Sequence, residues 1–185
     1  MEKHLVVSYR VWLLSALIIS TMLWTSAARA SEIEQIFRGF EIAPVRLNLA
    51  GKDWALVGLG SYLVNTTGCN DCHTYPNWAN GANPYLGQPE QMNTQGYMAG
   101  GRPFGPDPVN PNIQVVSANI TPDKNGRPAG LTLGAFLHVM HTGYDPDDPT
   151  RLLKVMPWPL YRWKTDRDLT AIYEYLRAIP RIPAN

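Results

Sequence analysis

Glycine and proline are concentrated in the middle of this chain, and they limit what can fold there. All 15 glycines and 16 prolines follow residue 30, so they make up 20% of the remaining 155 residues, against a usual level of about 12%. Seventeen of them fall among the 55 residues from Pro76 to Gly130. Runs such as residues 100–103 and 105–108 cannot form the interior of a helix. A domain with this much irregular chain needs something to pack around, and a large bound cofactor would serve.

Residues 1–30 are predicted to be a secretory signal peptide. A short basic start (Lys3, Arg10) is followed by 14 mostly apolar residues from Val11 to Trp24 and by the small-residue pattern Ala28-Arg29-Ala30. A membrane-spanning helix needs about 20 apolar residues, so an uncleaved anchor is the weaker alternative. We therefore expect cleavage after Ala30, a periplasmic or otherwise secreted protein, and no stable membrane insertion after cleavage.

The charge balance and the length limit the partners and the domain count. Sixteen basic residues against 15 acidic ones give a net charge of +1, which argues against a nucleic-acid partner. The charged fraction of 17% and the hydrophobic fraction of 45% are typical of an ordered globular chain. The length suits one domain. We expect residues 31–50 to form an N-terminal extension and residues 51–185 to form that domain.

The local patterns predict a mostly α-helical domain with a long Gly/Pro-rich loop region. An apolar segment from Trp54 to about Val64 predicts a first helix. Thr132 is a typical N-cap for a second helix, which Gly143 would end. Thr165, with Asp168 three residues later, caps a third helix that Pro180 stops. No stretch shows convincing strand alternation.

The segment Cys69-Asn70-Asp71-Cys72-His73 carries the chemistry. A CxxCH motif is the attachment signature of c-type haem. Two cysteines three residues apart lie on one side of a helical turn, where their sulfurs can form thioether bonds to the two vinyl groups of one porphyrin edge. The histidine that follows lies under the ring, where its neutral imidazole can bind iron. The motif therefore predicts one covalently attached haem c.

Three other interpretations of the two cysteines are weaker. A thioredoxin-like dithiol should open a helix after a strand, and no such strand is evident. A zinc site with His138 and His141 would need spacings outside the usual pattern. A plain structural disulfide would not require the histidine. The predicted export signal and the position of His73 favour haem over all three.

The second axial ligand of the iron separates electron transfer from other haem functions. Histidine and methionine together give an electron-transfer site with a raised potential, whereas an open sixth position admits small molecules. Met156 lies in a proline-stiffened loop before the last helix, but its spacing alone is equally typical of a buried loop residue. The sequence also offers Met92, Met98, Met140, His138 and His141.

The chain from about residue 51 to residue 180 resembles the class I c-type cytochromes. The segments that carry the resemblance are GLGSYLVNTTGCNDCHT, SANITPD and MPWPLYRWKTDRDLTAIYEYLRAIP. The chain looks closest to mono-haem cytochromes and to the cytochrome domains that accompany periplasmic dehydrogenases. The resemblance implies a cytochrome c-like fold, with helices packed around one covalent haem. It also implies that the first and last helices cross near Gly58, Tyr62, Tyr173 and Leu176.

The resemblance also assigns the positions around the iron. The thioether cysteines fall on Cys69 and Cys72, the proximal ligand falls on His73, and the distal ligand falls on Met156. The second ring nitrogen of the proximal histidine needs a partner, usually a backbone carbonyl, and Pro84 or Pro89 could supply it. The candidates for binding the haem propionates are Arg102, Trp158 and Arg162.

These features together predict an extracytoplasmic electron carrier rather than an enzyme, with redox proteins as its donor and acceptor. The first alternative is an electron-accepting cytochrome subunit of a periplasmic dehydrogenase, which would have the same site and a lasting interface. A haem peroxidase or gas sensor would need an open sixth position. A thiol-disulfide protein would need cysteines that carry no haem.

Overall fold

The computed structural model describes residues 31–183, and the predicted signal peptide lies outside them. The chain divides into two units, Met1–Gln35 and Ile36–Asn185. In the first unit, residues 31–35 are helical. No helix within residues 31–183 is long and apolar enough to cross a membrane.

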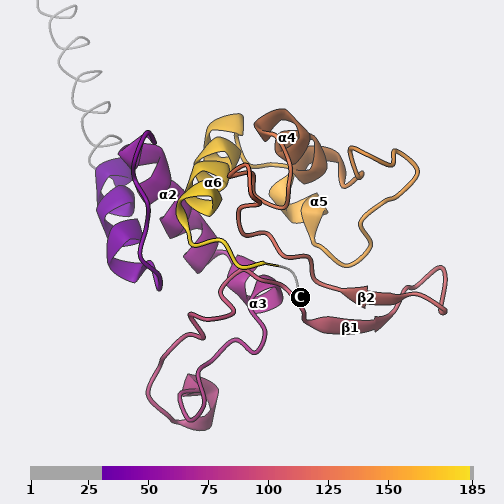
Figure 1. The fold of residues 1–185 in the computed structure, drawn as a ribbon, viewed down its shortest axis with the longest axis horizontal. Coiled ribbons are helices and arrows are strands. Elements are labelled where there is room, and N and C mark those ends of the chain that lie inside the picture. The colour runs from indigo at the N-terminus through magenta and orange to yellow at the C-terminus, as the bar shows by residue number, and fades with distance from the viewer. Residues whose placement is uncertain (1–30, 184–185) are drawn as a thin grey trace, which may run out of the picture. The chain divides into compact units, whose positions relative to one another are not determined.

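The regular structure of the second unit is mostly helical, with one small two-stranded sheet (Figure 1). Residues 36–42 are helical. The other elements, in chain order, are α2 (Trp54–Thr66), α3 (Cys69–His73), the 3₁₀ helix η1 (Pro84–Leu86), β1 (Pro103–Pro106), β2 (Gln114–Val116), α4 (Leu133–Thr142), α5 (Trp158–Tyr161) and α6 (Asp166–Ala178). This content is consistent with a cytochrome c-like fold.

Side-chain caps start the three helices that the sequence predicts. The carboxylate of Asp53 accepts hydrogen bonds from two backbone amides in the first turn of α2, and the Thr132 hydroxyl accepts one in α4. Thr165 and Asp168 form a reciprocal capping box at α6. Gly143 ends α4 with φ of 74°. The predicted helices are confirmed, and α2 runs slightly further than expected.

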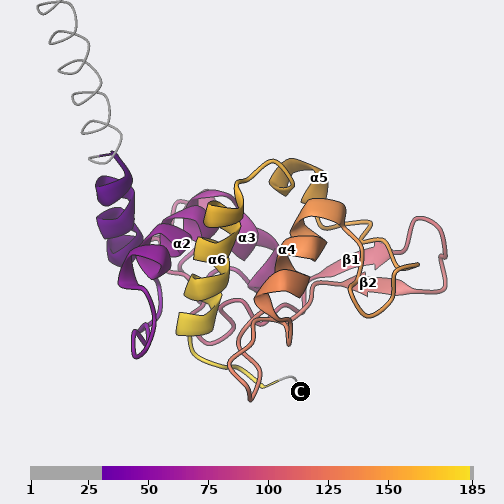
Figure 2. The same ribbon diagram turned by 90° about the horizontal axis from the view of Figure 1, so that it is seen from above.

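Helices α2 and α6 cross in close contact and form the centre of the core (Figures 1 and 2). A Cβ atom on Gly60 would overlap the backbone carbonyl of Ala171, so the two helix backbones touch at this glycine. On α2 this contact lies about half a helical turn beyond Gly58, the glycine at which the crossing was predicted. Ile36 and Phe40 fill the space beside Gly58 instead. Gly60 is therefore the residue that allows the helices to approach.

Tyr97 joins the irregular middle of the chain to this helix pair. Its side chain is 1% exposed, and its hydroxyl donates to Asn65 Oδ1 on α2 at 2.7 Å. The same hydroxyl lies 2.9 Å from the hydroxyl of Tyr175 on α6. Buried polar groups need such partners, so the three side chains fix the middle segment against both helices.

Strands β1 and β2 form an antiparallel ribbon that extends away from the helices (Figures 1 and 2). The sequence did not indicate these strands, because they have only four and three residues, and β1 begins and ends with proline. In the described part of the chain the backbones of the two strands lie close to each other and to none of the helices. The residues of the ribbon are not part of the hydrophobic core.

Candidate functional site

Helix α3 presents the whole CxxCH motif on a single five-residue helix. Gly68 precedes it with φ of 80°, a left-handed conformation that glycine adopts readily, and this turns the chain from α2 into α3. None of the five residues, all within the described chain, is buried. Cys69 and Cys72 are free thiols and half-buried. The motif thus lies at the edge of the core, with its cysteines and its histidine partly buried.

The imidazole of His73 is oriented by a backbone carbonyl, but the expectation of Pro84 or Pro89 was wrong. Nδ1 of His73 lies 2.8 Å from the carbonyl oxygen of Ala118. The chain returns to the motif much later than the sequence suggested, through the SANITPD segment. Gly100 and Gly101 link the motif to this segment. The amide of Gly100 donates to the carbonyl of His73 at 2.7 Å, and the amide of Gly101 donates to the carbonyl of Ser117 at 3.0 Å.

This contact determines which nitrogen of His73 can bind a metal. A carbonyl only accepts, so Nδ1 carries the proton and donates to Ala118, which leaves the lone pair on Nε2. Burial lowers the pKa of His73 below its ordinary value of 6.5, and the Ala118 carbonyl partly opposes this. The ring is therefore neutral at pH 7, as an iron ligand must be.

The pKa values of the two thiols are shifted in the opposite direction to those of a reactive dithiol. Burial raises the pKa of Cys69, with partial opposition from the Thr67 hydroxyl, and it also raises the pKa of Cys72, with partial opposition from Arg102. Thiol-disulfide catalysts need at least one thiol with a lowered pKa. The raised pKa values of these two cysteines therefore do not favour the thioredoxin-like interpretation.

Met156 lies on a segment that approaches α3. The residue is half-buried and packs against the main core cluster, as Cys69 does. Five residues further on, the hydroxyl of Tyr161 donates to the carbonyl of Thr67 at 3.0 Å. Burial and then the charges of Cys69 and Cys72 raise the pKa of Tyr161 to about 12. The structure therefore brings the Met156 segment next to the CxxCH motif.

The remaining candidate axial ligands are placed differently. Met98 and Met140 are buried in the core cluster, at 0% and 4% exposure. His138 is exposed. Both ring nitrogens of His141 are engaged, one by the Arg162 carbonyl and one by Asp166.

Met92 is the other methionine beside α3. Its sulfur lies 3.7 Å from Nδ2 of Asn70, within the motif itself. Both Met92 and Met156 pack against the core cluster that Cys69 also contacts. Met92 and Met156 are therefore the two partly buried methionines that remain as candidate ligands.

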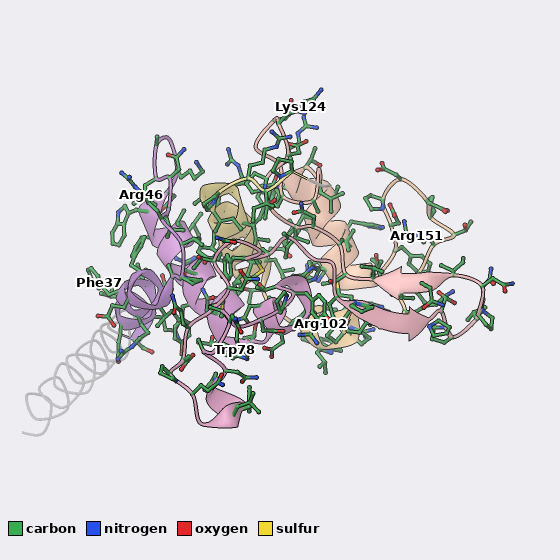
Figure 3. All side chains as sticks on the ribbon, turned by 60° about the horizontal axis from the view of Figure 1, so that its bottom comes forward. Phe37, Arg46, Trp78, Arg102, Lys124 and Arg151 are labelled. Atoms are coloured by element: carbon green, nitrogen blue, oxygen red, sulfur yellow. The ribbon has the colours of Figure 1, made fainter. Side chains whose placement is uncertain are left out.

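Among the three proposed propionate-binding residues, Arg102 has a buried donor that lacks a partner in the described chain. Its Nε atom is buried with no hydrogen-bond partner there, while its terminal nitrogen donates to Asn77 Oδ1. Its guanidinium lies over the ring of Tyr75, 5.2 Å from the centroid. Figure 3 shows Arg102 at the base of the ribbon, and an open cavity there is lined by both Arg102 and Cys72.

The other two proposed propionate-binding residues are engaged elsewhere. The indole N–H of Trp158 donates to the carbonyl of Leu153 at 3.1 Å. The guanidinium of Arg162 stacks over the ring of Trp163 at 4.7 Å from the centroid.

The residues present fit a haem c. Two free thiols, an imidazole with one nitrogen fixed and the other available, and nearby thioethers are the donor set that this group requires. The unpartnered Nε of Arg102 would be satisfied by an acceptor such as a carboxylate. Within residues 31–183, there is no cluster of three or more His, Cys, Asp or Glu side chains that could hold a metal ion.

The comparisons with known proteins support a cytochrome c. No family model matches the chain. Over 121 residues it is 30% identical to the gluconate 2-dehydrogenase cytochrome c subunit of Pantoea cypripedii. The match covers 65% of this chain and 22% of that protein, so the chain spans about a fifth of the relative's length. By its name, the relative is a cytochrome subunit of a dehydrogenase, which fits an electron carrier that is not itself catalytic.

Proposed function

We propose that this protein transfers electrons through one covalent haem c bound to Cys69 and Cys72, with His73 and Met156 as the axial ligands. The observation that carries the proposal is the contact between His73 Nδ1 and the Ala118 carbonyl at 2.8 Å, directly after two free thiols on the same helix. It commits the imidazole to one tautomer and leaves Nε2 for iron. A core or surface histidine would not need this arrangement beside two free thiols.

Each residue of the site has a defined task in this proposal. When bound, the haem supplies an iron that accepts and releases one electron. Ala118 holds the His73 ring in a fixed orientation, and such a partner also raises the basicity of a ligating imidazole. Met156 contributes a thioether, which raises the potential of the iron. Arg102 offers its unpartnered N–H to a carboxylate of the group, and its positive charge also favours the reduced state.

The comparison favours one of the two electron-transfer roles. The relative is named as a subunit of a dehydrogenase, so we propose that this chain accepts electrons from a dehydrogenase with which it assembles. A freely diffusing carrier in the periplasm, with transient donor and acceptor proteins, is the second candidate and has the same site. Because only 22% of the relative is covered, its gluconate substrate is not part of the proposal.

The axial ligand is tested with two methionine variants of the haem-loaded protein. Met156→Ala should keep the haem attached, lower its reduction potential, and allow imidazole to bind the oxidised iron more tightly. Met92→Ala is the matched control, because Met92 also lies beside α3. Redox titration and imidazole titration followed by absorbance give both quantities. An unchanged potential in Met156→Ala, or the same drop in Met92→Ala alone, would contradict Met156 as the ligand.

The subunit role is tested by purification from the native host. A dehydrogenase that stays with the tagged protein through size-exclusion chromatography, and that reduces its haem on addition of substrate, supports the subunit role. A protein that elutes alone but is reduced by an added dehydrogenase supports the freely diffusing carrier instead. A haem that no dehydrogenase reduces would contradict both.

A further inference from the structure

Lys154 forms an ion pair with the ribbon two residues before Met156. Its ammonium nitrogen lies 2.9 and 3.1 Å from the two carboxylate oxygens of Asp107. The side chains of Lys154 and Asp107 are 31% and 13% exposed, so water screens this pair less than a fully exposed one. The pair joins parts of the chain that are 47 residues apart.

The carboxylate of Asp107 is held in place by its own loop. Its Oδ1 atom accepts hydrogen bonds from the backbone amides of Val109 at 2.8 Å and Asn110 at 2.9 Å. Its backbone amide donates to the carbonyl of Ile113 at 2.7 Å and closes the loop between β1 and β2. Asp107 therefore offers Lys154 a preformed acceptor, and the lysine loses side-chain freedom when it binds.

The Met156 segment is anchored from the other side by the end of α4. The amide of Leu153 donates to the carbonyl of Gly143 at 2.8 Å, and the indole of Trp158 donates to the carbonyl of Leu153 at 3.1 Å. These contacts fix the residues on both sides of Met156. The Lys154–Asp107 pair adds a contact from a different direction, toward the ribbon.

This contact gives the ribbon a role in the fold. The backbones of its strands approach no helix in the described part of the chain, so close packing of these strands on the helices does not account for its presence. We propose that the ribbon acts as a strut: Asp107 holds Lys154, and Lys154 holds Met156 at the position from which its sulfur binds the iron. The two are positioning residues. This inference rests on the proposed function, because it takes Met156 as the ligand.

The experiment uses the haem-loaded full-length protein and measures the affinity of the oxidised iron for imidazole. Imidazole competes with the methionine, so a less well held Met156 gives tighter imidazole binding. The variants are Lys154→Met, Asp107→Asn and the double variant. Asn keeps an oxygen that accepts from Val109 and Asn110, so the loop is retained. Lys124→Met is the matched control, since Lys124 is an exposed lysine on a loop away from the ribbon (Figure 3).

Each single variant should bind imidazole about three- to fivefold more tightly, an effect of the size expected for one partly exposed ion pair. The double variant should show no more than the larger single effect, because both changes remove the same interaction. Lys154→Arg keeps the positive charge, so its affinity for imidazole should stay close to that of the wild type. The weak far-red sulfur-to-iron absorption band should lose most intensity in the variants that bind imidazole most tightly.

Two results would overturn the strut. One is unchanged imidazole affinity in Lys154→Met and Asp107→Asn while Met156→Ala binds imidazole much more tightly. The other is an equal gain in Lys124→Met. Failure of the proposed function looks different, because Met156→Ala itself would then leave the imidazole affinity unchanged, or no haem would be attached at all.

Discussion

The helix pair α2–α6 and the helices α3 and α5 differ in how they meet the core. Helix α2 has six buried residues and α6 has seven, whereas α3 and α5 have none, and all four helices lie within the described chain. The first pair is held by close backbone contact at Gly60 and by apolar burial. In the second pair, Cys69 and Tyr161 are only partly buried against the core cluster, and Tyr161 also donates a hydrogen bond to the Thr67 carbonyl.

The difference separates stability from function in this molecule. Burial of apolar side chains is the main source of folding free energy, so α2 and α6 form the scaffold. The candidate ligands lie on elements that contribute little to that burial, and their side chains remain available for chemistry. Variants of the scaffold should therefore change stability, and variants of the site should change redox and ligand-binding properties first.

The largest change in stability is expected at the helix crossing. Gly60→Ala places a methyl group against the carbonyl of Ala171, so the helices must separate, at a cost of about 3 kcal/mol in the free energy of unfolding. Gly134→Ala is the control, because nothing lies within 4 Å of its Cβ position on α4, and it should stabilise by about 1 kcal/mol. Urea unfolding followed by circular dichroism measures both. Equal effects of the two substitutions would contradict backbone contact at Gly60.

A smaller loss is expected where the two regions are joined. Tyr97→Phe removes the hydroxyl that donates to Asn65 and meets Tyr175, and it leaves those buried groups with one partner fewer. The cost should be about 1–2 kcal/mol in the same unfolding experiment. Tyr85→Phe changes a side chain that is 87% exposed and should have no measurable effect. A neutral Tyr97→Phe would show that the hydroxyl cluster does not hold the middle segment to the helices.

The smallest effect is a pH dependence at the junction of α4 and α6. His141 can donate to both the Arg162 carbonyl, at 3.0 Å, and Asp166, at 2.8 Å, only when it is protonated. The Asp166 carboxylate, with help from that carbonyl, raises the pKa of His141 above 6.5. The stabilisation is therefore complete below about pH 6.5 and is lost as the pH rises through the raised pKa.

This pH dependence is measured by urea unfolding of the wild type and of Asp166→Asn. At pH 5.5 the variant should be less stable by roughly 0.5 kcal/mol, a small value because the Asp166 side chain is largely exposed to solvent and the His141 side chain is partly exposed. At pH 8.5 the difference should disappear. A difference that stays constant from pH 5.5 to pH 8.5 would show that His141 is not the titrating group.

The sequence predicted what depends on neighbouring residues and not what depends on distant ones. The capping pattern at Thr165 and the CxxCH spacing are local, so the helix and the motif could be recognised directly. The carbonyl partner of His73 could not, because Ala118 follows it by 45 residues of chain with no periodic signal. The ribbon was missed because strands of four and three residues, with prolines at both ends of β1, show no alternation.

The roles of Cys69, Cys72, His73 and Met156 stay predictions, and they differ in their basis. The first three follow from a spacing that has a direct chemical reason. Met156 depended on the resemblance to class I cytochromes, because its position alone was equally typical of a buried loop residue. The structure places its segment beside the motif through Tyr161, but it places Met92 there as well. Only a ligand-sensitive measurement separates the two.

The most direct test of the whole account is the visible absorption spectrum of the oxidised and reduced protein, expressed together with a haem-attachment system. The account predicts covalently bound haem, with sharp bands in the reduced state and a weak far-red sulfur-to-iron band in the oxidised state. A high-spin spectrum would contradict methionine ligation and point to an open iron site. Protein without haem would contradict the cytochrome assignment itself.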